Sequence, residues 1–419
     1  MVEKSGDPAA YTDAPIVAAR PNVLRESQFI RFVLSTLTWG TGHMLVFMSH
    51  SFLIYDMTGS GLWLAALGAS IAIPQFLFAA VGGVLADRMP RRVMLISGSA
   101  IGAITMLILA VIAFVDALEP WHIVGAGLAF GAVLGNDWTT RQAFITNLVH
   151  ESQLIRAVSF DQTSFHVSRI IAPIMGGFLL SRTGAEGAFT FGLITFTLAT
   201  LLLVTLRPKQ EIGDRQPPVW EGIADAIDKI KNDTIILIVI VFTAVNALFL
   251  GGFIYLAPVY AKDILGGGSV EQGAILTGMG IGAVVGAFWL GWRGNVRMAG
   301  LGMLITNGLT VVVIGGFTVS TMLVASIAFA FVAGAANAVH ITLGTVAIQT
   351  RVDDEMRGRV FGVYEMAWGF FPAGGIVFGG LLAAFGPEAS LAIGVAGTGL
   401  VTAGIWLFSS VTRRYTLDQ

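Results

Sequence analysis

The stretch "GGVLADRMPRR" (residues 82–92) is a short charged segment between two long apolar runs. No Asp, Glu, Lys or Arg occurs from Leu62 to Val81 before it, or from Val93 to Val115 after it. A helix needs about 20 apolar residues to cross the roughly 30 Å hydrocarbon layer of a membrane, and both runs reach that length. The segment is therefore typical of a loop at a membrane surface.

The composition of the whole chain indicates an integral membrane protein. Of its 419 residues, 55% are apolar and only 12% are charged, whereas a soluble domain carries about 25% charged residues. The chain contains twelve apolar stretches of spanning length. They are residues 30–54, 62–86, 93–115, 121–145, 155–180, 186–206, 235–260, 272–292, 298–319, 321–346, 358–384 and 388–411.

The distribution of Lys and Arg predicts the orientation of the chain. When the connecting loops are assigned alternately to two sides, all but three of the 24 cations fall on the side of the N-terminus. Arg182 and Lys262 fall on the other side, and Arg169 lies inside a span. Because cytoplasmic loops hold the excess of Lys and Arg, we expect both termini in the cytoplasm. The first 24 residues are polar and lack a short apolar core, so we expect no signal peptide there.

A weak internal repeat divides the chain into two related halves. Shifted by 203 residues, the region from Val149 to Gly177 falls on the region from Val352 to Gly380 without a gap. Transporters built from two such halves place their substrate pathway at the interface between them. We expect a cytoplasmic tail (residues 1–24), an N-terminal six-helix bundle (25–206), a cytoplasmic linker (207–234), a C-terminal six-helix bundle (235–412) and a second cytoplasmic tail (413–419).

The linker contains a predicted amphipathic helix. Trp220, Ile223, Ile227 and Ile230 recur every three or four residues, with Asp and Lys on the opposite face. Such a helix either lies on the inner membrane surface or packs on the cytoplasmic ends of the spanning helices. The sequence leaves both alternatives open.

The opening stretch resembles the loop between the second and third helices of the major facilitator superfamily. The signature of that loop is Gly-x-Leu-Ala-Asp-Arg-x-Gly-Arg-Arg/Lys. This chain departs from it at Pro90, which replaces a glycine and stiffens the turn. The matching residues that we consider as candidate gating residues are Gly83, Asp87, Arg88, Arg91 and Arg92.

The resemblance implies a breakable ionic latch at the cytoplasmic surface. In the family, the aspartate and arginines of this loop tie helix two to the start of helix eleven and hold the cytoplasmic gate closed. Here the expected partner is Arg357 or Arg359, together with the positive N-terminal dipole of helix eleven. Positive-inside anchoring is the alternative, which explains the arginines but not Asp87 or Gly83.

Longer stretches narrow the resemblance to one branch of the superfamily. "TRQAFITNLVHESQLIRAVSF" (140–160) and "RVDDEMRGRVFGVYEM" (351–366) are similar to the branch of siderophore exporters, transmembrane secretion effectors and macrolide-efflux proteins, which implies export. "APIMGG" (172–177) partly matches the helix-five antiporter motif Gly-Pro-x-x-Gly-Gly. Ordinary close packing of small residues is the alternative for this last stretch.

Helix five carries two charged residues at membrane depth. Counted from Arg156, Asp161 lies about 8 Å and Arg169 about 20 Å inward, at 1.5 Å per residue. An unpaired guanidinium there costs at least ~2.5 kcal/mol, so Arg169 should face the cavity and have a partner. Two helical turns separate it from Asp161, which argues against a direct pair. Arg169 either anchors substrate or couples protons, or it donates hydrogen bonds to helix carbonyls.

Helix eleven carries Glu365, about 9 Å inward of Arg359. It approaches the centre from the helix that is pseudo-symmetric to that of Asp161. A carboxyl group that is alternately shielded and wetted can exchange a proton, as an antiporter requires. The alternative is a permanent hydrogen bond at the inner gate. Asp137 precedes Arg141 by four residues, which favours an inner-side salt bridge over a coupling site.

A histidine and three tryptophans complete the candidate substrate or proton-coupling residues. His43 lies seven residues before His50 on helix one and could titrate near neutrality. The two histidines have no nearby third ligand, so we expect no metal site. Trp39, Trp138 and Trp368 fall in spans that should line the cavity. If they do, the substrate is bulky and amphipathic.

The chain has no phosphate-binding G-x-x-x-x-G-K-[ST] motif and no Ser-His-Asp or H-E-x-x-H arrangement, so we expect no enzyme, catalytic residue or cofactor. We expect an all-α membrane protein with twelve transmembrane helices in two pseudo-symmetric bundles. It should act as a monomer in the bacterial inner (plasma) membrane, with a small-molecule substrate, protons as the coupling ion and no nucleic acid. The expected function is proton-coupled export by alternating access. The alternatives are uptake of an organic anion held by Arg169, or a non-transporting receptor or scaffold.

Overall fold

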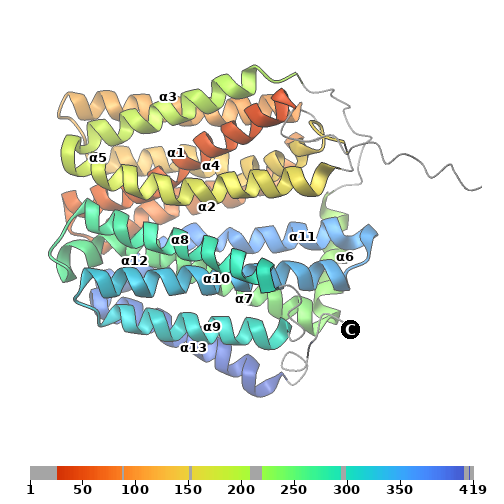
Figure 1. Cartoon of the computed structure of the whole chain (residues 1–419). Coiled ribbons are helices and arrows are strands. Elements are labelled where there is room, and N and C mark those ends of the chain that lie inside the picture. The colour runs from red at the N-terminus through yellow and green to blue at the C-terminus, as the bar shows by residue number, and fades with distance from the viewer. Residues whose placement is uncertain are drawn as a thin grey trace, which may run out of the picture.

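The computed structural model describes residues 26–86, 89–150, 153–207, 219–293, 299–409 and 415. All regular secondary structure within these residues is helical. Long helices run alongside one another in two stacked groups, one in the upper half and one in the lower half of Figure 1. The structure confirms the predicted all-helical class.

The upper group contains the first five helices. They are α1 (Ser27–Thr58), α2 (Gly61–Ala86), α3 (Arg91–Phe114), α4 (Pro120–Ile145) and α5 (Leu154–Val204). In this group α1 and α3 pack along α5, and α2 packs along α4. Gly184 interrupts α5 with φ 66° and ψ −157°, and two helices meet there. Glycine adopts this backbone conformation without strain, and so α5 forms two arms where the sequence predicts two spans.

The lower group contains the remaining helices. They are α6 (Val219–Asn232), α7 (Thr234–Val259), the π-helix η3 (Tyr260–Ile264), α8 (Ser269–Arg293), α9 (Ala299–Thr318), α10 (Leu323–Arg351), α11 (Asp354–Trp368), α12 (Phe370–Phe385) and α13 (Pro387–Phe408). Only Gly369 separates α11 from α12, and its backbone is helical. The two helices therefore correspond to one predicted span.

Nine helices within the described residues are long and apolar enough to cross a membrane. The predicted number is higher by three, because α5 counts once and because α1 and α4 are not among the nine. These two helices carry buried polar groups such as His43, Asp137 and Arg141. The number of membrane crossings stays a prediction.

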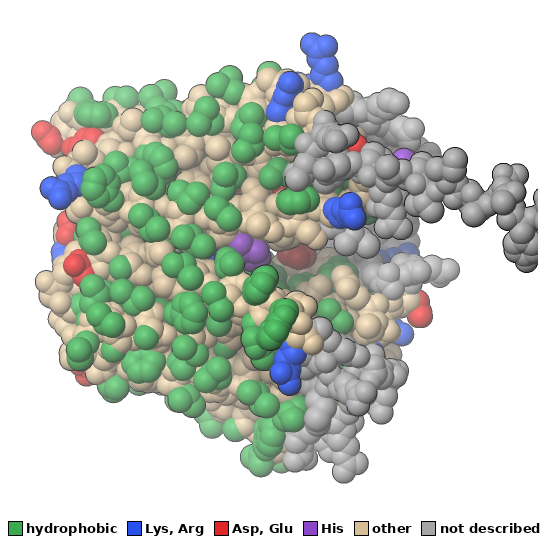
Figure 2. All heavy atoms as spheres, in the orientation of Figure 1, with side chains coloured by type: hydrophobic (Ala, Val, Ile, Leu, Met, Phe, Trp, Pro, Cys, Tyr) green, Lys and Arg blue, Asp and Glu red, His purple; other side chains and the backbone are tan. Residues whose placement is uncertain are grey.

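Large apolar side chains cover the outside of the molecule (Figure 2). Phe288, Trp292 and Phe408 expose 75%, 82% and 90% of their surface. A soluble monomer rarely exposes broad apolar surfaces of this kind, whereas lipid tails cover them in a membrane. The chain is a multi-pass membrane protein.

The packing of α6 decides between the two alternatives for the linker helix. Ala226 and Ile230 are buried in a cluster with residues of α7 and α11, whereas Ile227 is 39% exposed. Asp225 accepts a hydrogen bond from Arg359 of α11 at 2.7 Å. The described part of α6 therefore packs on the ends of the spanning helices. The side chains of Trp220 and Ile223 lie outside the described residues.

Candidate functional site

The two groups of helices meet along a seam, which is closed at the end of the molecule where α1 finishes. The Tyr55 hydroxyl donates a hydrogen bond to Asp263, and the Lys262 ammonium lies 2.5 Å from the Asp56 carboxylate. We call these four residues the outer clasp. Lys262 and Asp263 belong to the π-helix η3. The wider turn of a π-helix brings successive side chains closer to one face, which suits two adjacent contacts.

Small residues and further hydrogen bonds close the same half of the seam. The Ser269 hydroxyl of α8 donates to the Gly177 carbonyl of α5 at 2.9 Å. Gln272 of α8 donates to the Ser51 hydroxyl of α1 at 3.3 Å. A Cβ atom at Gly177 would meet the Ser269 carbonyl, so only glycine allows this approach. The "APIMGG" stretch is thus a packing surface between α5 and α8, and its role in proton sealing stays a prediction.

Every hydrogen bond that joins described residues of the two halves lies in this closed part. Toward the other end, Figure 2 shows a hollow between the halves, with a histidine and an acidic side chain visible in it. Among the described residues, the seam is bonded at the end where α1 finishes and hollowed toward the end where α1 begins.

The described candidate gating residues bond within their own half. Arg91 donates to the Ala143 carbonyl at 2.9 Å, and Arg92 donates to the Val204 carbonyl at 2.5 Å. Arg359 is held by Asp225, as stated above. Asp87 and Arg88 lie outside the described residues, as does the side chain of Arg357, and Gly83 lies within α2. The cytoplasmic latch stays a prediction.

A buried cluster around Arg141 lies inside the upper half. The Arg141 guanidinium donates to the Asp137 carboxylate at 3.0 Å, and these side chains are 0% and 2% exposed. This is the ion pair that the spacing of four residues predicts. Ser35 and Thr36 of α1 and Ser99 of α3 lie 3.4–3.5 Å from the other guanidinium nitrogens. Three helices thus converge on one cation.

Asp161 of α5 is fully buried beside this cluster. Thr36 lies next to its carboxyl group, and Arg141 acts on it electrostatically. Neither carboxyl oxygen accepts a hydrogen bond of normal geometry from the described residues. An ionised carboxylate in such surroundings is costly unless it is paired. Asp161 therefore stays a candidate coupling residue.

Aromatic rings form a wall next to the Arg141 cluster. The Arg141 guanidinium lies 4.4 Å from the Trp39 ring centroid, a cation–π distance. The ring centroids of Trp39 and His43 are 4.9 Å apart, and those of Trp138 and Phe165 are 4.7 Å apart. Trp39 and His43 are buried, whereas Trp138 and Phe165 are half-buried. The structure therefore brings together predicted residues from α1 and α4.

Arg169, Glu365 and Trp368 lie apart from the Arg141 cluster, and all three are half-buried. The Arg169 carbonyl lies 2.8 Å from where a Cβ of Gly280 in α8 would stand, which places Arg169 at the seam. No ion pair or hydrogen bond joins the side chain of Arg169 or Glu365 to another described residue. Arg169 and Asp161 form no ion pair among the described residues.

The lower half holds an uncharged polar network instead. Asn246 of α7 donates to Asn307 of α9 at 2.7 Å, and Asn307 lies 2.9 Å from His340 of α10. His340 is thus a hydrogen-bonded packing group. The charged chemistry of the described interior is concentrated in the upper half and at the seam.

The fold is that of a multi-pass membrane protein in which two groups of helices meet along a seam, an arrangement found in transporters. A family model described as transmembrane secretion effector matches residues 20–417. The chain belongs to this family of the major facilitator superfamily.

Relatives of this chain include export proteins. It is 26% identical over 339 residues to the enterobactin exporter EntS of Salmonella typhi, covering 80% of each chain. It is 25% identical over 335 residues to macrolide efflux protein A of Streptococcus pyogenes, covering 75% of this chain and 79% of the relative.

Solved structures of transporters share the fold. A D-xylose–proton symporter superposes with a TM-score of 0.68 at 17% identity, over 93% of this chain and 98% of that chain. A bacterial homologue of the human lysosomal transporter Spinster, in an inward-facing and occupied conformation, has a TM-score of 0.68 at 14% identity, over 92% of this chain and 97% of that chain. At these identities the likeness concerns the fold alone.

Proposed function

We propose that this protein is a proton-coupled exporter of bulky, amphipathic organic molecules, which works by alternating access between two six-helix bundles. The observation that carries the proposal is the position of Asp161. Its carboxyl group is buried beside Arg141, which already forms an ion pair with Asp137. We also propose that both termini lie in the cytoplasm of a bacterium and that the protein acts as a monomer in the plasma membrane. The outer clasp then lies at the external surface.

Alternating access follows from the position of the contacts across the seam. A rocking movement that separates the outer clasp would open the external end, as in transporters built from two related halves. The cytoplasmic latch between Asp87 and Arg357 or Arg359 would form in the same movement. In the present state Arg359 is held by Asp225 at 2.7 Å, so latching through Arg359 requires this exposed pair to break. An exposed pair of this kind contributes ~1 kcal/mol or less, which makes exchange feasible.

The competition between two carboxyl groups for Arg141 supports the proposed proton coupling. One guanidinium cannot compensate two carboxylates in apolar surroundings, and Asp137 holds it in this state. Asp161 then carries a proton. When the halves rock, Arg141 or Thr36 can move toward Asp161; the O–H bond of Asp161 breaks and the proton passes to water in the cleft. Glu365 of α11 is a second candidate for the same role.

The substrate class follows from the side chains that are only half-buried. Trp138 and Phe165 offer ring surface for a flat apolar part of the substrate. Arg169 has no counter-ion among the described residues, which favours an acidic group on the substrate. The same observation favours a second candidate function, uptake of an organic anion. The names of the two relatives above, an enterobactin exporter and a macrolide efflux protein, support export.

Transport in proteoliposomes tests the proposal. The probes are amphipathic aromatic dyes in acidic, neutral and basic forms, and the measured quantity is the dye flux with and without an imposed pH gradient. We expect a proton gradient to drive dye export in the native chain, whereas Asp161→Asn abolishes this drive and retains dye exchange. Asp225→Asn, a matched change outside the cluster, should retain both activities. Normal proton-driven dye flux in Asp161→Asn contradicts the coupling role of Asp161. Movement of dye in the same direction as the protons, toward the side that corresponds to the cytoplasm, favours uptake.

A further inference from the structure

A line of rings runs along α1 from the Arg141 cluster toward the seam. The Arg141 guanidinium lies 4.4 Å from the centroid of the Trp39 ring, which is 4.9 Å from the centroid of His43. The His43 centroid is in turn 5.7 Å from that of Phe47. Rings attract one another at centroid distances of about 4.5–7 Å. Each ring in the line is therefore in direct contact with the next.

The line continues across the seam into the lower half. The Phe47 ring meets Phe371 of α12 at a centroid distance of 5.3 Å and Tyr255 of α7 at 6.3 Å, and both pairs are nearly perpendicular. Phe47 is 6% exposed, and Tyr255 is fully buried. Met48, the next residue of α1, accepts a hydrogen bond from Gln272 across the seam. Along α1, Phe47 thus lies at the inner limit of the bonded part of the seam.

The spacing of the ring residues explains how one helix reaches both places. Trp39, His43 and Phe47 are four residues apart, and each step of four residues turns the side chain by about 40° around a helix of 3.6 residues per turn. The stripe therefore winds from a helix face inside the upper half to one at the seam. Neither nitrogen of His43 forms a hydrogen bond with a described residue, so the neighbouring rings orient this side chain.

We propose that these rings couple the position of Arg141 to the closure of the seam. The residues that we call the ring relay are Trp39, His43, Phe47, Tyr255 and Phe371. The proposal rests on the proposed function, in which Arg141 moves toward Asp161 as that carboxyl group loses its proton. Coupling between separate sites is carried by packed side chains of this kind.

The relay acts through its contacts at both ends. When Arg141 moves, its guanidinium leaves the face of Trp39, and the cation–π attraction is lost. Trp39 and His43 are then free to shift, and the edge-to-face contacts of Phe47 across the seam weaken. The external end opens more readily as a result. Because such coupling is reciprocal, opening of the external end also changes the proton affinity of Asp161.

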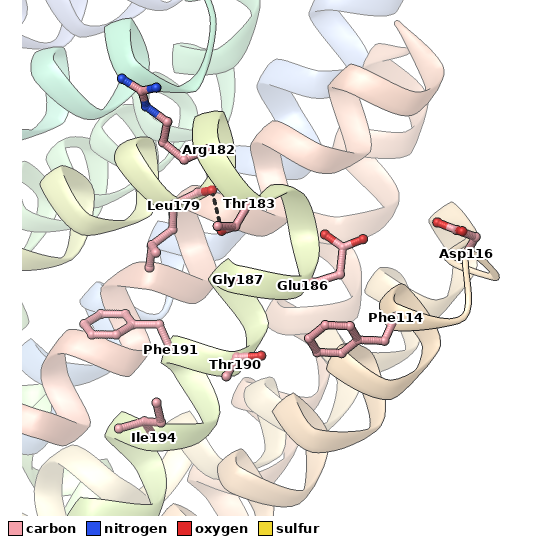
Figure 3. Close-up of a pocket in the computed structure, with 10 residues that line it drawn as sticks. All are labelled: Phe114, Asp116, Leu179, Arg182, Thr183, Glu186, Gly187, Thr190, Phe191 and Ile194. Carbon is pink, nitrogen blue, oxygen red and sulfur yellow. Dashed lines mark hydrogen bonds between the residues drawn. The ribbon is translucent and has the colours of Figure 1, made fainter.

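Other rings of the upper half lie outside the relay. Phe32, near the beginning of α1, packs against Phe144 of α4 at a centroid distance of 5.4 Å. Phe191 of α5 lines a groove of about 810 Å³ together with Phe114 of α3 (Figure 3). Within the described residues, neither Phe32 nor Phe191 makes a ring contact with the relay. Both residues therefore provide controls.

Thiol labelling of the full chain tests this proposal. A cysteine in place of the fully buried Ser51 reports opening of the external end, because the chain has no natural cysteine. Asp137→Asn removes the present partner of Arg141 and favours its movement toward Asp161 without substrate or a proton gradient. We expect this change to raise the maleimide labelling rate about fivefold, the effect of one aromatic pair. In the presence of Phe47→Leu, Asp137→Asn should leave the rate unchanged.

Three further variants make the result specific. Phe32→Leu and Phe191→Leu should retain the fivefold response to Asp137→Asn. Phe371→Leu removes one of the two ring contacts across the seam and should lower the response to about twofold. A fivefold response that persists with Phe47→Leu overturns the proposal. So does the absence of a response when all relay rings are present, or an equal loss with Phe32→Leu.

The relay and the proposed function can fail separately. If Asp161→Asn abolishes proton-driven flux while Phe47→Leu retains the labelling response, the relay is overturned and the proposed function stands. If Phe47→Leu abolishes the labelling response while Asp161→Asn retains proton-driven flux, the relay is supported and Asp161 is not the coupling residue.

Discussion

Weakening the outer clasp should shift the seam toward a state that is open at the external end. The Lys262 and Asp56 side chains are 32% and 46% exposed, so solvent screens their ion pair. A pair of this exposure contributes ~1 kcal/mol at most. Lys262→Gln should therefore raise the open population about fivefold. Tyr55 is only 7% exposed, and its hydrogen bond to the Asp263 carboxylate contributes about 2 kcal/mol. Tyr55→Phe should raise the open population about thirtyfold.

Thiol labelling measures this population, because the chain contains no natural cysteine. Ser51 is fully buried beneath the clasp, so a single cysteine at this position reacts with a maleimide only when the external end opens. The labelling rate of Ser51→Cys should rise fivefold with Lys262→Gln and thirtyfold with Tyr55→Phe. Lys229→Gln is the matched control, since Lys229 pairs with Asp353 within the lower half at 3.9 Å. Equal labelling rates with and without Tyr55→Phe would show that the outer clasp does not hold the external end closed.

Three further predictions concern stability and coupling. Arg141→Met leaves the Asp137 carboxylate buried without its cation and should lower the free energy of unfolding by ~3–5 kcal/mol, seen as a lower Tm. Adding Asp137→Leu should restore most of this stability. An unchanged Tm for the single variant would contradict the buried pair. Gly177→Val forces a side chain against the Ser269 backbone and should lower the free energy of unfolding by ~1–3 kcal/mol. Gly125→Val is the control, because a Cβ atom there meets no neighbouring atom, and it should not change the Tm. Similar Tm values for both variants would argue against the tight α5–α8 contact. Glu365→Gln should abolish proton-driven flux in proteoliposomes and spare substrate exchange; normal proton drive would remove Glu365 from the coupling site.

Local sequence patterns predicted the features that depend on neighbouring residues. The Asp137–Arg141 pair follows from a spacing of one helical turn, and the structure has it at 3.0 Å. The apolar runs on either side of Gly184 predicted two spans, and the backbone reverses at that glycine. The loop after α2 resembles the signature of the major facilitator superfamily, and this likeness predicted the superfamily. Such a signature is a run of consecutive residues, so it can be recognised without knowing which helices pack together.

Features that join distant parts of the chain were beyond sequence reasoning. Tyr55 and Asp263 are 208 residues apart, and nothing in either local pattern indicates that α1 and η3 meet. The hydroxyl groups around Arg141 come from α1 and α3, and ordinary Ser and Thr residues in apolar helices give no signal. Amphipathic spacing could not choose between membrane and protein as the partner of α6, because both surfaces accept the same apolar face.

Cross-linking the outer clasp tests the central claim most directly. A short bifunctional thiol reagent that contains a disulfide would bridge Asp56→Cys to Lys262→Cys across the seam, and Lys229→Cys to Asp353→Cys within the lower half as the control. If the halves rock at this seam, the first bridge stops transport in proteoliposomes until a reductant cleaves it, whereas the control bridge has no effect. Undiminished transport with the clasp fully bridged would contradict alternating access at this seam.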